Sequence, residues 1–67
     1  MAKGTVKWYN KEKGFGFIMA DEGGRDIYVQ TKNIETPDEH LMEGQRVEYE
    51  LELGRKGPEA THVKNLS

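Results

Sequence analysis

The sequence predicts a small all-β protein in which five short strands close into a single barrel. Three features predict this fold: a length of only 67 residues, a period-two alternation of apolar and polar residues, and glycine turns between the alternating segments. A chain of this length holds one domain, spanning residues 1–67, and is too small for two packed sheets of good size. Closing one sheet into a barrel also removes its exposed edges.

The five strands are expected where apolar and aromatic residues recur between turns. In chain order they occupy residues 5–9, 15–19, 26–30, 46–53 and 59 to about 66. The third follows the turn at Gly23 and Gly24 and is rich in β-branched and aromatic residues. The fourth alternates charged and apolar side chains without a break, which predicts one wet face and one buried face. The fifth follows the turn residues Gly57 and Pro58.

The alternation is lost between residues 31 and 45. Residues 36–39 (TPDE) read as a turn, or as the cap of a very short helix with Pro37 in its first turn. We therefore expect a loop or a single helical turn in this segment.

The third strand indicates which of its side chains face the barrel interior. Gln30 shares a face with Tyr28, while Ile27 and Val29 share the other. Burying an unpaired amide costs a few kcal/mol. Ile27 and Val29 are therefore expected inside, and Tyr28 outside.

In the second strand Phe15 and Phe17 share one face, and Ile18 lies on the other. In an arbitrary sequence two such rings belong to the core. Here Gly16 between them fits a close backbone approach or a bend better than a packed strand centre. The chain also holds enough aliphatic residues to fill a small barrel without the rings, namely Val6, Ile18, Ile27, Val29, Val47, Leu51 and Val63. We therefore expect both phenylalanines outside, beside Tyr28.

Such an exposed aromatic patch rarely occurs on a soluble monomer without a binding role. Lys7, Lys11 and Lys13 lie close to it in the sequence. Flat rings edged by ammonium groups suit single-stranded nucleic acid, which offers a base to each ring and a phosphate to each cation.

The net charge of -2 conceals an uneven distribution of charge along the chain. Residues 1–20 hold four lysines against one acidic residue, residues 21–54 hold three basic residues against ten acidic ones, and residues 55–67 hold three against one. Because local potential governs association with a polyanion, the acidic total does not exclude a nucleic-acid-binding face.

The sequence resembles the cold-shock domain family over residues 3–63. Residues 7–10 (KWYN) and 13–18 (KGFGFI) are similar to its first strand and first ribonucleoprotein-type motif, and residues 26–29 (DIYV) to its second. Gly57 and Pro58 resemble its closing turn. The resemblance implies a five-stranded antiparallel OB-type barrel that binds single-stranded RNA and DNA through its first three strands, and an RNA chaperone function.

The resemblance also implies a set of binding residues. Trp8 belongs to this set, although strict alternation places it on the inner face with Val6; a bulge between them would turn it outward. Gln30, which replaces a histidine of the family, is expected to hydrogen-bond a base edge. The complete expected set is Lys7, Trp8, Asn10, Lys13, Phe15, Phe17, Asp26, Tyr28, Gln30 and Lys56.

Several positions depart from the family pattern. Tyr9 stands where phenylalanine is usual, and Gln30 and Thr31 stand where most members have His and Phe. The next loop, which usually supplies another aromatic residue, offers only His40. With two or three stacking positions missing, at about 1–3 kcal/mol each, we expect weaker binding and a shorter footprint than in members with the full set.

Enzymatic function is not expected. The chain has no cysteine, its only serine is Ser67, and its two histidines, His40 and His62, lie in no metal-binding or catalytic spacing. We expect no cofactor, metal, small-molecule substrate or membrane partner. The protein is expected in the cytoplasm as a monomer, although an exposed aromatic face permits a weak or strand-swapped dimer.

Two alternatives use the same barrel differently. The acidic middle segment and the missing His-Phe pair are compatible with a protein-interaction module that has weakened or lost nucleic-acid binding. An SH3-like barrel would bind proline-rich peptides in an aromatic groove, but such grooves gain little from the interleaved lysines.

Overall fold

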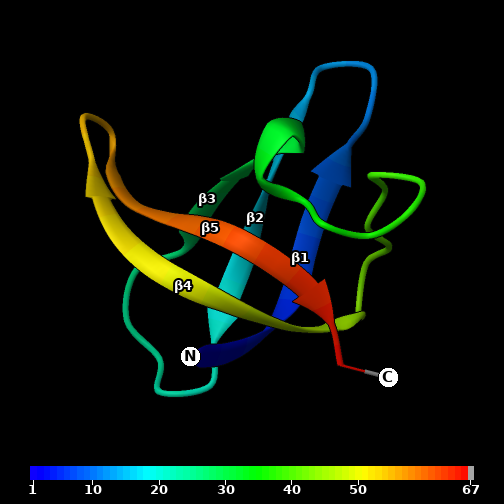
Figure 1. The fold of residues 1–67 in the computed structure, drawn as a ribbon. Coiled ribbons are helices and arrows are strands. Elements are labelled where there is room, and N and C mark those ends of the chain that lie inside the picture. The colour runs from blue at the N-terminus through cyan, green and yellow to red at the C-terminus, as the bar shows by residue number, and fades with distance from the viewer. Residues whose placement is uncertain (67) are drawn as a thin grey trace.

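Five strands form a closed barrel in the computed structural model, which describes residues 1–66 (Figure 1). Each expected strand is present, with ends that move by at most three residues. In chain order they are β1 (Ala2–Asn10), β2 (Phe15–Ala20), β3 (Ile27–Gln30), β4 (Arg46–Gly54) and β5 (Gly57–Asn65). The expected all-β barrel is confirmed, and Ser67 lies outside the described residues. No helix within residues 1–66 is long and apolar enough to cross a membrane.

The strands follow one another around the barrel in the order β1-β2-β3-β5-β4, and β4 closes onto β1. In Figure 1, β4 and β5 cross in front of the wall made by β1, β2 and β3. Four of the strand pairs are antiparallel, but β3 and β5 are parallel, with Tyr28 opposite Glu59. The expectation of a wholly antiparallel barrel is wrong for this pair. The long connection after β3 lets β4 run in the opposite direction to β3. The β4–β5 hairpin then reverses the chain once more, so β5 runs parallel to β3.

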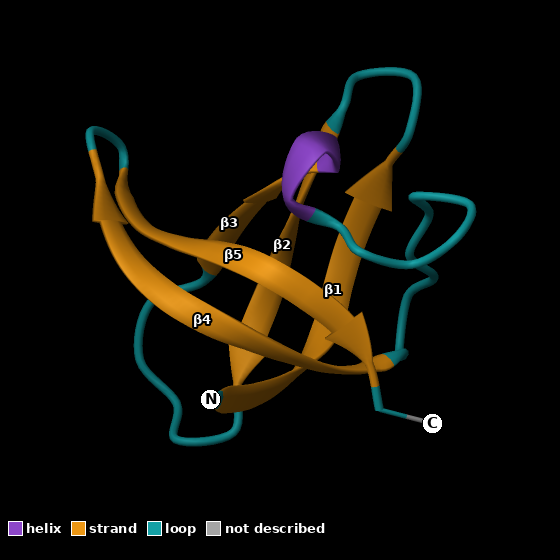
Figure 2. Cartoon of the chain, in the orientation of Figure 1, coloured by secondary structure: helices purple, strands orange, loops and turns teal. Residues whose placement is uncertain are grey.

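The helical turn expected between residues 31 and 45 is present at the start of that segment. It is the short 3-10 helix η1 (Thr31–Asn33), drawn in purple in Figure 2. Residues 36–39 form a turn instead, in which the amide of Glu39 donates to the carbonyl of Thr36 over 3.1 Å. Pro37 thus belongs to a turn, one of the two interpretations that the sequence allowed.

The barrel interior holds ten buried hydrophobic side chains and no buried charged or polar residue among those described. Leu51, expected inside, is 54% exposed, and Tyr49 is fully buried instead. The pairing of β4 with β1 ends at Tyr49, and the register with β5 shifts between Glu48 and Glu50. Beyond this point residues 50–54 of β4 are all exposed, whereas Ala60, opposite Leu51 on β5, stays in the core. The complete core is Val6, Ile18, Ile27, Val29, Ile34, Leu41, Val47, Tyr49, Ala60 and Val63.

The buried Tyr49 hydroxyl has no hydrogen-bond partner among the described residues. Burial raises the pKa of this phenol, and the charges of Asp21 and Glu22 raise it further. Because an unsatisfied buried polar group costs about 1–3 kcal/mol, Tyr49→Phe should increase the free energy of unfolding by about 1 kcal/mol or more. Denaturant titration of both proteins measures the difference.

Tyr9→Phe is the matched control for that substitution. The Tyr9 hydroxyl makes hydrogen bonds to Thr31 and to the carbonyl of Glu39, so its removal should lower the free energy of unfolding by about 1 kcal/mol. If Tyr49→Phe destabilises the protein as much as Tyr9→Phe does, the Tyr49 hydroxyl is satisfied and the assignment is wrong.

Candidate nucleic-acid interface

Four aromatic rings lie side by side on the outer wall of β1, β2 and β3. All four rings are half-buried. The three on β2 and β3 alternate with the buried positions Gly16, Ile18, Ile27 and Val29. Neighbouring ring centroids are 5.4–6.4 Å apart. We call this group the aromatic surface; it consists of Trp8, Phe15, Phe17 and Tyr28. The outward placement of the two phenylalanines and of Tyr28 agrees with the expectation from the sequence.

Trp8 reaches the aromatic surface because β1 contains a bulge. Val6 pairs with Ile18 and Trp8 pairs with Phe17, so Lys7 is an extra residue between two consecutive pairs. The extra residue reverses the side-chain alternation, which puts Val6 in the core and Trp8 outside. The bulge expected between Val6 and Trp8 is confirmed.

Gly16 lets β1 approach β2 closely beneath the rings. A Cβ at this position would collide with the Trp8 carbonyl oxygen and lie 2.8 Å from the Cα of Tyr9. Both neighbours are backbone atoms of the paired strand, so they cannot turn aside as a side chain can. The close backbone approach expected at Gly16 is therefore present.

Two lysines lie near the aromatic surface. The Lys56 ammonium lies 5.5 Å from the centroid of the Tyr28 ring, within the range of a cation–π contact. Lys7 forms an ion pair with Asp26 over 2.9 Å, and both side chains are substantially exposed. An exposed pair of this kind is worth at most about 1 kcal/mol, so a phosphate can compete for the lysine.

Two other expected site residues lie where β1 turns into β2: Asn10 is the last residue of β1, and Lys13 belongs to the turn. The Asn10 side-chain oxygen accepts a hydrogen bond from the Lys13 amide over 3.0 Å, and its carbonyl accepts one from Gly14 over 2.9 Å. Asn10 therefore shapes the turn that carries the exposed Lys13 next to Phe15. No contact of Asn10 with the four rings is needed for this role.

Arg25 was missed by the sequence analysis. It lies against the β4–β5 turn, where a Cβ on Gly57 would be 2.9 Å from its guanidinium. It also lines an open hollow of about 480 Å³ over the aromatic surface, together with Phe15, Phe17, Asp26, Tyr28, Lys56 and Pro58. The sequence did offer one signal for Arg25: it is a basic residue two positions before β3, next to the expected site residue Asp26.

Gln30, expected to contact a base edge, makes a hydrogen bond within the protein. Its Nε2 donates to Oε2 of Glu59 over 2.8 Å, and Nδ2 of Asn33 donates to the same oxygen over 3.4 Å. The amino group of Gln30 is thus engaged within the protein.

Two departures from the family pattern contact each other. The hydroxyl groups of Tyr9 and Thr31 are 2.7 Å apart, and the Tyr9 hydroxyl also donates to the Glu39 carbonyl over 3.1 Å. The ring of His40 lies edge-on to Tyr9, with centroids 5.6 Å apart. Tyr9 therefore fastens the segment after η1 to the end of β1, and His40 is the exposed ring of that segment.

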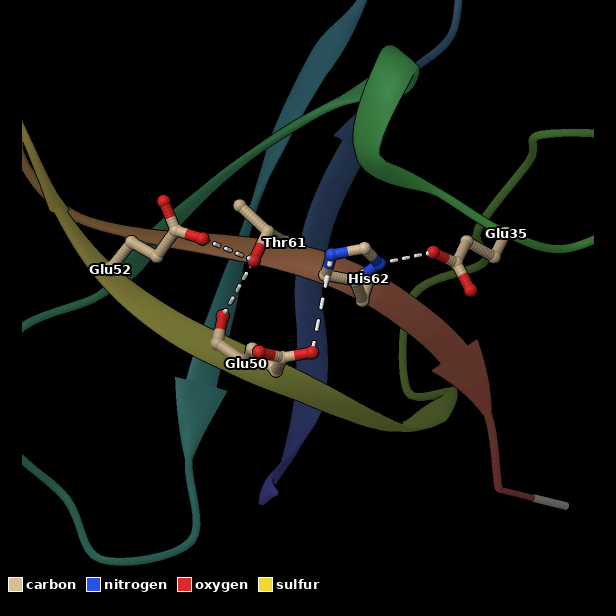
Figure 3. A network of polar contacts seen from close by, with 5 residues as sticks. All are labelled: Glu35, Glu50, Glu52, Thr61 and His62. Atoms are coloured by element: carbon tan, nitrogen blue, oxygen red, sulfur yellow. Dashed lines mark hydrogen bonds and ion pairs between the residues drawn. The ribbon is translucent and has the colours of Figure 1, made fainter.

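A separate polar cluster surrounds His62 on β5 (Figure 3). His62 Nδ1 lies 2.5 Å from Glu35, and its Nε2 lies 4.0 Å from Glu50. The residue adopts a φ of 49°, a left-handed conformation that is costly for a non-glycine residue in a strand. The hydrogen bond and charge of Glu35, then the charges of Glu50 and Glu52, raise the pKa of His62 above 6.5.

This cluster predicts a pH-dependent stability. Because folding raises the pKa of His62, its contribution is present below about pH 6.5 and is lost as the pH rises through the folded-state pKa. Between about pH 5.5 and about pH 8.5 the melting temperature should fall more in the native protein than in His62→Asn, since asparagine tolerates the same φ. Parallel curves for the two proteins would contradict the role of the imidazolium.

Within residues 1–66 no group of histidine and acidic side chains is arranged to hold a metal ion. Apart from Tyr49 and His62, the groups whose pKa is shifted belong to an exposed ion pair or to a turn. Arg46 donates two hydrogen bonds to Asp21 over 2.6 and 2.7 Å, which lowers the pKa of that carboxyl group. Neither Asp21 nor Arg46 belongs to the aromatic surface.

Comparison with known proteins agrees with this geometry. The family model of the 'Cold-shock' DNA-binding domain matches residues 2–66. The cold shock-like protein CspA of Vibrio cholerae is 50% identical over 64 residues, which are 94% of this chain and 91% of that protein. A cold shock-like protein of Thermotoga maritima is 51% identical over 63 residues, covering 92% of this chain and 94% of that protein.

The solved structure of drosophila Unr CSD456 superposes with a TM-score of 0.83 over 98% of this chain, at 18% identity. The chain spans only 26% of that longer protein, so this likeness concerns the fold. The family model and the near-complete coverage of the bacterial relatives decide the classification. The chain belongs to the cold-shock domain family, a family of nucleic-acid-binding proteins that are not enzymes.

Proposed function

We propose that this protein binds single-stranded RNA and DNA by stacking unpaired bases on the aromatic surface. The observation that carries the proposal is the set of four adjacent rings, 5.4–6.4 Å apart, on three neighbouring strands. A duplex hides its base faces, whereas a single strand exposes one to each ring. Stacking is worth about 1–3 kcal/mol per base and tolerates any base, which suits a protein that meets many transcripts.

The role we infer is that of a monomeric cytoplasmic RNA chaperone. A protein that binds only the unpaired form shifts the equilibrium of a weak hairpin toward the open strand by mass action. The ring positions that are missing from η1 and the following segment shorten the footprint to the nucleotides over β1, β2 and β3. The protein should therefore release its strand readily, as a chaperone must.

The expected binding residues have different parts in this proposal. Trp8, Phe15, Phe17 and Tyr28 stack on bases, and Lys7, Lys13 and Lys56 contact phosphates, with Arg25 added as a fourth cation. Asp26 holds Lys7 beside the rings through their 2.9 Å ion pair, and Asn10 shapes the turn that carries Lys13.

Fluorescence titration tests the proposed function, since a base stacked on Trp8 should quench its emission. With pyrimidine-rich oligonucleotides we expect saturable quenching with an affinity weaker than nanomolar at physiological salt. If about three phosphates are neutralised, log affinity should fall with log salt at a slope near -2, from about -0.7 per contact. Nanomolar affinity at physiological salt would contradict the shortened footprint.

Two variants that each lose one positive charge test whether the salt dependence of the affinity arises at the aromatic surface. Lys13→Gln should make the slope shallower by about 0.7, because one phosphate contact is lost. Lys64→Gln removes the same charge from β5, where Lys64 pairs with Glu48 of β4, and should leave the slope unchanged. Equal slopes for the two variants would place the strand elsewhere on the protein.

A further inference from the structure

Glu59 places a carboxylate at one edge of the aromatic surface. In the parallel pair of β3 and β5 it lies opposite Tyr28, so the two side chains share the outer face of the barrel. Gln30, two residues beyond Tyr28 on β3, shares that face. Oε2 of Glu59 accepts hydrogen bonds from Gln30 over 2.8 Å and from Asn33 over 3.4 Å.

These bonds fix the direction of both amide groups. A carboxylate accepts hydrogen bonds and cannot donate them, so Gln30 and Asn33 each turn their NH₂ group toward Glu59. Their carbonyl oxygens consequently turn away from it. The Glu59 carboxylate is therefore the main acceptor that a base arriving at this edge meets, with the amide oxygen of Gln30 as a second acceptor beside it.

Glu59 and Gln30 line a small hollow of about 270 Å³ beside the Tyr28 ring. Its lining consists of Tyr28, Gln30, Arg55, Lys56 and Glu59. Glu59 is the one acidic residue of this lining, and Arg55 and Lys56 supply positive charge for the backbone of the bound strand. The hollow thus combines a ring, a set of acceptors and two cations within reach of one nucleotide.

We propose that this hollow is a base-selective subsite that prefers a base with an amino group over thymine or uracil. The proposal rests on the single-strand binding proposed above. Guanine fits best, because its N1–H and N2 amino group are adjacent donors that a carboxylate can accept together. Adenine and cytosine offer one amino group each. Thymine and uracil present one N–H between two carbonyl oxygens, and these oxygens face the acceptors unfavourably.

A position scan tests the subsite. Binding of a dT hexamer is compared with that of hexamers in which a single dG replaces each dT in turn. A good base contact discriminates by about tenfold, so one position of the scan should bind about tenfold more tightly than the dT hexamer. The same scan is run with Glu59→Gln and, as a charge-matched control outside the hollow, with Glu43→Gln. Melting temperatures confirm that both variants are folded.

The expected result is that Glu59→Gln loses the dG preference and binds the dT hexamer at least as tightly as the native protein, while Glu43→Gln keeps the preference. An undiminished preference in Glu59→Gln, or native binding of all hexamers without preference, overturns the subsite and leaves single-strand binding intact. If no hexamer binds, the proposed function itself fails, and the subsite fails with it.

Discussion

Replacing both phenylalanines of β2 should weaken oligonucleotide binding by one to four orders of magnitude. Each ring offers one stacking platform worth about 1–3 kcal/mol, so Phe15→Ala and Phe17→Ala together remove about 2–6 kcal/mol. The rings touch each other, with centroids 6.0 Å apart, so the two losses need not add. Fluorescence titration of Trp8 gives the affinity of each single variant and of the double variant.

The melting temperature should change little in these variants, because the ten core residues do not include either ring. Leu53→Ala is the control: it removes a large apolar side chain that is 88% exposed on the β4–β5 hairpin and is not one of the four rings. It should bind oligonucleotides as the native protein does. A double variant that binds normally, or one that unfolds while Leu53→Ala is stable, would place the phenylalanines in a structural role.

Gly16→Ala should destabilise the protein strongly. The new methyl group would overlap the backbone of Trp8 and Tyr9 on β1, and strand pairing holds both atoms in place. Forced overpacking costs about 1–3 kcal/mol where side chains can adjust, so a clash with backbone should cost about 3 kcal/mol or more. In a domain of this size that is a large share of the total stability. Denaturant titration followed by circular dichroism measures it.

Gly23→Ala separates the clash from the general cost of losing a glycine. Gly23 has a φ of 84°, and nothing lies within 4 Å of the position of an added Cβ. Its substitution should cost only the left-handed backbone penalty of about 1–2 kcal/mol. If Gly16→Ala is as stable as Gly23→Ala, β1 and β2 are not as close at Gly16 as described above.

The sequence predicted the aromatic surface well because strand parity is a local property. Ile27 and Val29 alternate with Tyr28, and a polar Gln30 on the same face as Tyr28 decides which side is wet. The bulge at Lys7 was expected only because the family resemblance conflicted with that parity at Trp8. A disagreement between strand alternation and family resemblance at one residue can thus locate a β-bulge.

The features that sequence reasoning missed depend on where distant segments meet. The alternation of residues 46–53 gives Tyr49 and Leu51 the same face, but only the end of pairing with β1 decides that Leu51 is wet. The tie between Gln30 and Glu59 depends on the parallel pairing of β3 and β5. Neither follows from a local pattern, because each requires knowing which strands become neighbours when the barrel closes.

Chemical-shift mapping with oligo-dT tests the central claim most directly. Addition of the oligonucleotide should shift the signals of Trp8, Phe15, Phe17 and Tyr28 together and saturate with a single affinity. Signals of the exposed hairpin residue Leu53 should stay in place. If the four aromatic signals do not respond at millimolar oligonucleotide, base stacking on this surface is wrong, and the surface is better explained as a site for another protein.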